Sequence, residues 1–303
     1  MRDMKIASAI DLGSNTALIL IGKKVGEIID TIYEAIRTTR LGEGVIETGM
    51  ISEVSLQRIL DVMIEYKRAM DDNRVTAIRC VGTSALRKAK NSQIIIDEVY
   101  NKTGIMVEII DENEEARLSF LSATNSLNIK GKCIILDVGS YSSQVSWGKD
   151  GQIESVFSIP IGCLVVKEVM VKKGSGYDIK RIEGIIADGI NKASYKNIDG
   201  ELIIVGGSAV AGATLLLGLD KYERRLIHGI SVGLEDIEEM AVALALMSED
   251  AIKNKMTFEP ERADIIVPGL IIITRFMKFL GYDKGRICWW GLTYGILSEM
   301  LSK

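Results

Sequence analysis

The chain has 303 residues, enough for about two domains, and it is 47% apolar and 26% charged with only 3 prolines. This composition is typical of a folded globular protein and argues against a disordered, fibrous or disulfide-scaffold protein. The net charge of −4 argues against a dominant nucleic-acid-binding surface, so we expect no nucleic-acid partner.

Histidine and cysteine content narrows the possible chemistry. The single histidine, His228, excludes any site that needs two imidazoles, which removes most zinc hydrolases. The cysteines are far apart and lie in apolar surroundings, so we predict buried free thiols in a reducing compartment. They are Cys80, Cys133, Cys163 and Cys288.

Strand and helix patterns alternate along the chain, which favours an α/β fold with helices packed on sheets. The apolar run 6–10 ends at Asp11, before it reaches the length of a signal peptide, and we expect a cytoplasmic protein. Helices are predicted over 52–70, 111–127 and 234–247, and a strand over 75–81.

One uncharged stretch, 202–219, approaches the minimum length of a membrane span. Gly206-Gly207-Ser208 interrupts it, with β-branched residues before the glycines and alanine and leucine after them. This order predicts a strand, a glycine turn and a buried helix, and no membrane partner.

A short internal repeat divides the chain into two halves. The sequence IDLGS at 10–14 returns as LDVGS at 136–140, and a Gly-Lys pair follows each aspartate at the same distance, at 22–23 and 148–149. Each copy predicts a strand, a tight turn, a second strand, a hairpin that begins at the Gly-Lys pair, and a third strand. We infer two related domains that face each other across a cleft, with 125–132 as the linker.

The repeated turns have the composition of a phosphate- and metal-binding site. Glycine lets the backbone approach an anion, and successive N–H groups can point into one concavity. Asp11 and Asp137 would hold Mg²⁺ or orient a water; the alternative is that both only cap their own turns. Further donors are available from Ser14, Asn15, Thr16, Ser142 and Ser143.

Other segments carry candidate groups of their own. The turn at 206–208 precedes a predicted helix, and helix starts attract anions. Arg87 is suited to clamp a phosphate, with a surface ion pair as the alternative, and Arg37 and Arg40 are similar candidates. Trp289-Trp290 is expected to serve packing, with ligand stacking as the alternative.

An acidic cluster at 108–115 surrounds the predicted start of the helix at 111. Most of these carboxylates are expected to stabilise the helix dipole, and one of them would be a general base if it faced the site. Glu114 and Glu115 point about 100° apart on a helix, so local reasoning leaves the choice between them open.

In chain order, these segments resemble the exopolyphosphatase/guanosine pentaphosphate phosphohydrolase family, within the actin/hexokinase/Hsp70-like superfamily. The matching segments are AIDLGSNT (9–16), GTSALRKAKN (82–91), EEARL (114–118), LDVG (136–139), SIPIG (158–162), VGGS (205–208) and RADIIVPGL (262–270). The resemblance implies two ribonuclease-H-like domains with mixed sheets flanked by helices, 1–126 and 127–303. It also implies that the C-terminal helix can pack back on the first domain.

The resemblance further implies the roles of individual residues. Glu115 would be the general base, Asp137 a second catalytic group that also binds Mg²⁺ with Asp11, and Gln144 would position water. Mg²⁺ is the implied cofactor and a homodimer the implied assembly. The phosphate-binding residues would be Ser14, Asn15, Thr16, Arg87, Gly139, Ser140, Ser142, Gly206, Gly207 and Ser208.

The second turn departs from the family pattern Asp-Ile-Gly-Gly-Gly-Ser-Thr-Glu, because Ser140 and Tyr141 replace two glycines and Gln144 replaces the final carboxylate. If the turn needs positive φ at the first two positions, each costs about 1 kcal/mol. Tyr141 would also obstruct the path of the phosphate, and Gln144 adds no charge to a metal site.

We therefore expect a phosphohydrolase that removes the terminal phosphate of inorganic polyphosphate or guanosine pentaphosphate through Mg²⁺-assisted attack of water. The altered turn motivates an alternative, a catalytically weakened sensor that binds the same ligands. A sugar or acetate kinase relative is a weaker third hypothesis. The sequence does not separate polyphosphate from guanosine pentaphosphate.

Overall fold

The computed structural model describes residues 5–26, 28–169, 171–172, 176–193 and 199–302. The chain divides into two compact units: unit 1 comprises Met1–Leu118 and Leu292–Lys303, and unit 2 comprises Ser119–Gly291. These limits differ from the expected 1–126 and 127–303, because helix α5 (Glu112–Ser126) begins in unit 1 and ends in unit 2. The final helix, α13 (Leu292–Ser302), belongs to unit 1.

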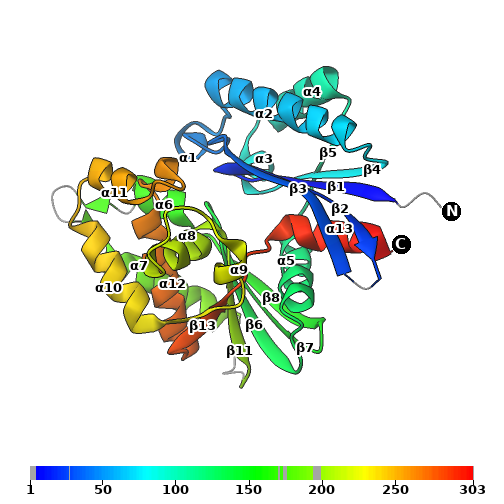
Figure 1. The fold of residues 1–303 in the computed structure, drawn as a ribbon. Helices are drawn as coiled ribbons and strands as arrows, with labels where there is room; N and C mark the ends of the chain where they lie inside the picture. Colours follow the sequence, from blue (N-terminus) through cyan, green and yellow to red (C-terminus); the bar gives the residue numbers. More distant parts are fainter. Residues whose placement is uncertain (1–4, 27, 170, 173–175, 194–198, 303) are drawn as a thin grey trace. The chain divides into compact units, whose positions relative to one another are not determined.

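Unit 1 is built on a five-stranded sheet with the strand order β3-β2-β1-β4-β5 (Figure 1). The first three strands are antiparallel, and β4 and β5 run parallel to β1. The strands are β1 (Ile6–Leu12), β2 (Thr16–Val25), β3 (Ile28–Thr38), β4 (Ala77–Gly82) and β5 (Val107–Ile109). Besides α5 and α13, the helices are α1 (Val45–Thr48), α2 (Glu53–Asp72), α3 (Ser84–Lys88) and α4 (Ser92–Thr103).

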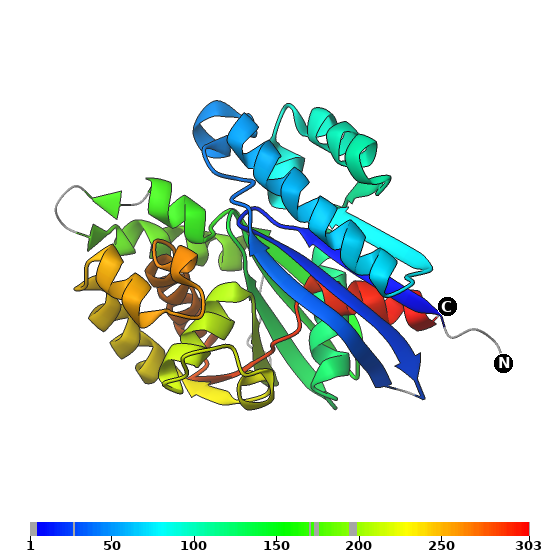
Figure 2. The same ribbon diagram turned by 45° about the horizontal axis from the view of Figure 1, so that its top comes forward.

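Helices α2 and α13 cover opposite faces of this sheet (Figure 2). Helix α2 begins where the Ser52 hydroxyl accepts a hydrogen bond from the Ser55 N–H (3.1 Å), so the predicted helix over 52–70 is confirmed. Its buried Tyr66 donates a hydrogen bond to the Ala17 carbonyl in β2 (2.7 Å). Helix α13 approaches α5 so closely that a Cβ on Gly295 would collide with the Leu118 carbonyl.

Unit 2 is built on a six-stranded sheet with the order β12-β13-β11-β6-β7-β8. Its strands are β6 (Lys132–Val138), β7 (Ser143–Lys149), β8 (Gln152–Ile159), β11 (Glu201–Val205), β12 (Ser231–Gly233) and β13 (Lys284–Ile287). A separate two-stranded sheet contains β9 (Val171–Lys172) and β10 (Gly176–Tyr177). The helices are α6 (Cys163–Val169), α7 (Ile179–Lys192), α8 (Gly207–Leu216), α9 (Arg224–Ile227), α10 (Leu234–Ala245), α11 (Glu249–Lys255) and α12 (Ile266–Leu280).

Alternation along β6 gives unit 2 two layers of core. Ile134 and Leu136 pack in the larger core, which also contains residues of α7, α8, α10 and α12. Cys133 and Ile135 pack in a smaller core with Phe120 of α5. The stretch 202–219 contains β11 and α8, which confirms the predicted strand, turn and helix. Within the described residues, no helix combines the length and apolar character needed to cross a membrane.

The sequence repeat corresponds to a structural repeat. Strands β1-β2-β3 and β6-β7-β8 pair in the same register, with Leu12 opposite Ala17 and Val138 opposite Ser143. In both units the turn closes with one hydrogen bond of the same kind, from Gly13 N–H to the Thr16 carbonyl and from Gly139 N–H to the Ser142 carbonyl, each 3.0 Å. This agreement supports the inferred duplication.

The two Gly-Lys pairs mark an irregularity of the sheet. Gly22 and Gly148 each follow a register shift in the pairing with the third strand. A Cβ at either position would collide with a carbonyl group of that strand, so the bulge requires glycine. The prediction that both pairs begin a turn is wrong, because both lie inside strands: β2 continues to Val25 and β7 to Lys149.

All four cysteines are buried free thiols, as predicted. Burial raises the pKa of Cys133 and of Cys288 to about 11. These thiols therefore stay protonated near neutral pH and are poor nucleophiles.

His228 connects two backbone segments of unit 2. Its Nδ1 accepts a hydrogen bond from the Trp289 N–H (3.2 Å), so the neutral ring carries its proton on Nε2, 3.2 Å from the Ser126 carbonyl oxygen. Burial lowers the pKa of His228, and the positive charges of Arg286 and Arg224 lower it further, although the bond to Ser126 opposes this. Protonation of Nδ1 would remove the acceptor for Trp289.

Acidification is therefore expected to weaken the fold through His228. Because its folded pKa is lowered, its stabilising contribution is complete above the unfolded pKa of about 6.5 and is lost as the pH falls from that value through the lower folded pKa. Denaturant titrations at pH 7.5 and 5.5 measure this loss, with His228→Asn, whose side-chain oxygen keeps an acceptor, as the comparison. A loss of equal size in both proteins would contradict the prediction.

Candidate active site

The carboxyl ends of three parallel strands gather the candidate residues of unit 1. Leu12 of β1 pairs with Gly82 of β4, and Gly82 pairs with Ile109 of β5, so the segments that follow these strands leave from one edge of the sheet. The half-buried Asp11 stands at the end of β1, and the buried Ser14 and Asn15 form the turn that leads to Thr16.

Arg87 and Glu115 meet at this edge. Arg87 Nη2 lies 2.7 Å from Glu115 Oε2, and both side chains are only 15% exposed. The guanidinium also donates hydrogen bonds to the Ile110 carbonyl (2.8 Å) and the Ser84 hydroxyl (3.1 Å). The pair is thus a shielded contact held from three sides rather than the exposed ion pair that was the alternative for Arg87.

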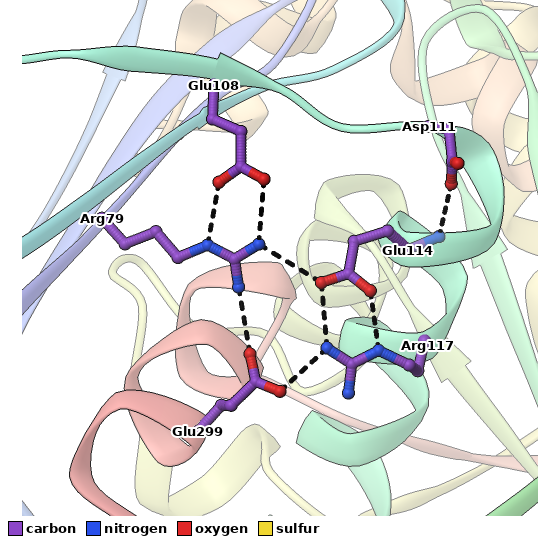
Figure 3. Close-up of polar contacts among 6 residues, drawn as sticks. All are labelled: Arg79, Glu108, Asp111, Glu114, Arg117 and Glu299. Atoms are coloured by element: carbon purple, nitrogen blue, oxygen red, sulfur yellow. Dashed lines mark hydrogen bonds and ion pairs between the residues drawn. The ribbon is translucent and has the colours of Figure 1, made fainter. Parts of the chain in front are cut away.

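Glu114 has a different environment, shown in Figure 3. Its carboxylate binds Arg117 (2.7 Å) and Arg79 of β4 (3.2 Å), and both guanidiniums also bind Glu299 of α13. Glu108 of β5 binds Arg79 from the other side (3.1 Å). We call these five residues the ion-pair network of unit 1. Asp111 caps the helix by accepting a hydrogen bond from the Glu114 N–H (2.8 Å).

The network occupies Glu114 and leaves Glu115 beside Arg87. It joins β4, β5, α5 and α13, and it therefore fixes the start of α5, from which Glu115 projects. The geometry therefore distinguishes the two carboxylates between which local sequence reasoning left the choice open: Glu114 belongs to the network, and Glu115 contacts Arg87 at the sheet edge.

We expect Arg79 and Glu299 to be energetically coupled. Their side chains are only 23% and 26% exposed, and the Nη1–Oε2 distance is 3.1 Å. In a double-mutant cycle with Arg79→Met and Glu299→Gln, the coupling energy should be about 1 kcal/mol. The exposed pair Lys67–Asp71 of α2 is the matched control, with about 0.3 kcal/mol expected. Similar coupling energies in the two cycles would contradict the special role of the network.

The second candidate edge lies in unit 2, where β6 and β11 run parallel and Asp137 pairs with Val205. Asp137 is half-buried and accepts a hydrogen bond from the Ser119 hydroxyl of α5 (2.7 Å). Burial raises the pKa of Asp137, although the hydrogen bond from Ser119 opposes this shift. The ionised form of Asp137 therefore lowers the free energy of unfolding.

The glycine turn at 206–208 lies beside Asp137. Gly206 has a φ of 107°, and a Cβ there would lie 2.7 Å from the Val138 carbonyl and 3.4 Å from Asp137 Oδ1. Ser208, at the start of α8, is buried, and its hydroxyl has no hydrogen-bond partner among the described residues. The sequence-predicted residues of unit 2 are therefore brought together at one sheet edge.

Sequence reasoning gave no role to a buried ion pair behind this turn. Arg262 binds Glu259 through two contacts (2.6 and 2.9 Å), and both side chains are almost fully buried. A Cβ on Gly207 would lie 2.5 Å from Arg262 Nη2, so glycine is needed for the guanidinium to lie against the turn. The Glu-x-x-Arg spacing at 259–262 was the available signal.

The altered turn of unit 2 does not carry the expected strain. Neither Ser140 nor Tyr141 has a positive φ, so the predicted conformational cost is absent. Tyr141 is fully buried, and its obstruction of the phosphate path stays a prediction. A Cβ on Gly162 would collide with the backbone of Ser140, which explains the glycine that ends the segment 158–162.

Gln144 lies directly across from Asp137 in the β6–β7 pairing, so the two side chains share one face of the sheet. It is buried, and its Nε2 donates a hydrogen bond to the Ser142 hydroxyl (3.2 Å). This position is compatible with the predicted role in water positioning, which stays a prediction.

Two other candidates have local partners. Arg37 donates to Glu65 through Nε and Nη2 (3.1 and 2.5 Å) and to the Ile36 carbonyl through Nη1 (2.9 Å), so all three nitrogens of its guanidinium are engaged. Trp289 packs against Tyr222 with ring centroids 5.6 Å apart, and Trp290 stacks under Arg224 at 4.8 Å. These contacts agree with the packing role expected for both tryptophans.

The residues present fit a Mg²⁺ ion held mainly by its ligand and by water. In the described ranges, no group of three or more His, Cys, Asp or Glu side chains gathers as a protein-only metal site would require. Mg²⁺ commonly uses one or two carboxylates, waters and phosphate oxygens. A cation would stabilise the ionised form of Asp137, which burial disfavours. Asp11 occupies the equivalent position in unit 1.

Comparison with known proteins identifies the fold class of this architecture. Two successive units with three antiparallel strands followed by parallel ones define the two-domain actin-like fold. An Aquifex aeolicus member of the Ppx/GppA family has 25% identity and a TM-score of 0.84, covering 99% of this chain and 98% of that one. An exopolyphosphatase from Cytophaga hutchinsonii, at 22% identity, has a TM-score of 0.88 with 98% of both chains covered.

A model of the Ppx/GppA phosphatase family matches residues 20–303, and the chain belongs to this family. A guanosine-5'-triphosphate,3'-diphosphate pyrophosphatase of Photobacterium profundum is 29% identical over 98% of the chain and 59% of its own length. A bifunctional 3-dehydroquinate synthase/phosphatase of Fusobacterium nucleatum is 24% identical over 92% and 44%. The chain thus spans about half the length of these relatives.

Proposed function

We propose that the protein is a phosphohydrolase that removes the terminal phosphate of inorganic polyphosphate or guanosine pentaphosphate. The observation that carries the proposal is the shielded Arg87–Glu115 pair at the sheet edge that also bears the Asp11 turn. At that edge the Arg87 guanidinium can bind a phosphate, and the adjacent Glu115 carboxylate can activate the attacking water. Membership of the Ppx/GppA phosphatase family supports the same conclusion.

In this proposal Glu115 accepts the proton of the attacking water. When a phosphate binds, Arg87 exchanges its hydrogen bond to Glu115 for hydrogen bonds to the phosphate oxygens. The carboxylate is then available as a base at the moment when substrate is present. This order of events links substrate binding to activation of the base.

The two turns would bind the phosphate oxygens through backbone N–H groups and hydroxyls. Gln144 would hold the water near Asp137, and Asp11 and Asp137 would hold Mg²⁺, which offsets the charge of the phosphate when bound. We also propose a cytoplasmic homodimer. The proposed phosphate-binding residues are Ser14, Asn15, Thr16, Arg87, Gly139, Ser140, Ser142, Gly206, Gly207 and Ser208.

Phosphate release in the presence of Mg²⁺, measured with polyphosphate and with guanosine pentaphosphate, tests the proposal. Turnover of either substrate supports it, and the ratio of the two kcat/KM values identifies the preferred one. Binding of either ligand without turnover overturns it in favour of the sensor hypothesis. Absence of both binding and turnover overturns both.

The sensor hypothesis now depends on Gln144, because the backbone at Ser140 and Tyr141 is unstrained. Gln144→Glu restores the carboxylate of the family pattern at a position that faces Asp137. If the wild-type turn is already competent, this variant leaves kcat within about threefold of wild type. A gain of more than about tenfold, roughly 1.4 kcal/mol, would identify the native turn as weakened.

A further inference from the structure

Two buried serines hydrogen-bond the second half of α5 to the rest of unit 2. The Ser119 hydroxyl donates to Asp137 Oδ2 at the end of β6 (2.7 Å), and the Ser122 hydroxyl donates to the Trp290 carbonyl after β13 (2.9 Å). Both serines are almost fully buried. A buried hydroxyl destabilises the fold unless it is hydrogen-bonded, so these two bonds help to fix the position of α5 on unit 2.

The two serines differ in their acceptors. Ser122 bonds to a neutral backbone carbonyl, a contact that serves packing alone, whereas Ser119 bonds to the carboxylate that is the proposed metal ligand. Ala123, one helical turn after Ser119, and Phe120 both pack in the smaller apolar core. An apolar side chain would therefore suit the burial of position 119, and the role of its hydroxyl is the bond to Asp137.

This bond gives the two oxygens of Asp137 different environments. Oδ2 is held by Ser119, while Oδ1 lies on the side of the glycine turn, where a Cβ on Gly206 would be 3.4 Å from it. Because Gly206 has no Cβ, the space beside Oδ1 stays open. Across the described ranges, Asp137 makes no side-chain hydrogen bond other than the one from Ser119. The bond therefore selects the oxygen that faces the turn.

We propose that Ser119 is a positioning residue, which holds Oδ2 of Asp137 so that Oδ1 is presented to Mg²⁺ at the Gly206 turn. The inference rests on the proposed function, in which Asp137 binds Mg²⁺, and adds a residue to that site. A donated hydrogen bond also stabilises the ionised carboxylate, which is the form that a cation binds. Groups that hold a metal ligand in place typically contribute about 10- to 100-fold to metal affinity.

Binding of Mn²⁺, followed by electron paramagnetic resonance, tests the inference without any need for turnover. Ser119→Ala and Ser119→Cys remove the strong donor, the cysteine without leaving a cavity, and Ser119→Thr keeps the hydroxyl. Ser122→Ala is the matched control, because it removes an equally buried hydroxyl from the same helix. Asp137→Asn identifies the part of the signal that belongs to this site.

Ser119→Ala and Ser119→Cys are expected to raise the Kd for Mn²⁺ by about 10- to 100-fold, with Ser119→Thr closer to wild type. In phosphate release, the Mg²⁺ concentration for half-maximal rate should rise by the same factor, while the KM for polyphosphate changes little. Ser122→Ala should lower the Tm as much as Ser119→Ala, by about 2–4 °C, and leave the Kd for Mn²⁺ unchanged.

Two results would overturn the inference: an unchanged Kd in Ser119→Ala, or an equal rise in Ser122→Ala. Mn²⁺ binding that Asp137→Asn does not alter would also overturn it, while turnover of wild type would still support the phosphohydrolase. If wild type hydrolyses neither phosphate substrate, but loses Mn²⁺ in both Asp137→Asn and Ser119→Ala, the phosphohydrolase is overturned and the role of Ser119 is supported.

Discussion

Replacing Glu115 with glutamine is expected to lower kcat for phosphate release by about 100- to 10,000-fold, the usual contribution of a positioned general base. Glutamine keeps the shape of the side chain and can still accept a hydrogen bond from Arg87, which lies 2.7 Å from the carboxylate. It cannot accept the proton of the attacking water. The KM should therefore change little, and initial-rate kinetics on polyphosphate would show the loss in kcat alone.

Two neighbouring carboxylates provide matched controls on the same helix. Glu112→Gln, in the first turn of α5, should leave both kcat and stability near wild type. Glu114→Gln should lower the midpoint of chemical denaturation, because Arg79 and Arg117 lose a shared partner, while kcat stays within about fivefold of wild type. Loss of turnover in Glu114→Gln with full activity in Glu115→Gln would reverse the assignment.

The substitution Asp137→Asn should raise the stability of the protein and lower its activity. The carboxylate is half-buried with a raised pKa, so its ionised form destabilises the folded chain at neutral pH. Asparagine has a similar shape, carries no charge and can still accept the hydrogen bond from Ser119. We expect a higher Tm than wild type at pH 7.5 and a fall in kcat of about 1,000-fold, because the proposed metal ligand is lost.

The pH dependence of the Tm difference between Asp137→Asn and wild type is the control for this prediction. Because the folded pKa of Asp137 is raised, the destabilisation is complete above that pKa and disappears as the pH falls through it towards the unfolded value. The Tm difference between variant and wild type should therefore shrink on acidification. An Asp137→Asn protein that is less stable at pH 7.5, or that keeps wild-type turnover, would refute this role for Asp137.

Local pattern and repetition were sufficient to predict much of the fold. The spacing of Ile59 and Met63 with a serine cap predicted α2, and the glycines at 206–207 separated β11 from α8 correctly. These features depend on neighbours in sequence, which composition and periodicity record. The repeated aspartate turns were also visible, because the same register was retained in both units.

Features that depend on distant contacts were not predictable in the same way. The ion pair of Arg262 and Glu259 lies against Gly207 only because the chain returns there after more than one helix. The complete burial of Tyr141 was not predicted either. Whether a side chain points inwards is decided by tertiary packing, which the sequence of a short turn does not encode.

The discontinuity of unit 1 imposes an order on its synthesis. Unit 2 is one continuous segment, whereas unit 1 is completed by α13, which leaves the ribosome after all of unit 2. Until then, the sheet face that Leu297 contacts at Gly22 lacks its covering helix, and Arg79 lacks Glu299. During this period the nascent unit 1 exposes apolar residues of its sheet. Chaperone binding at this stage would protect that surface from aggregation.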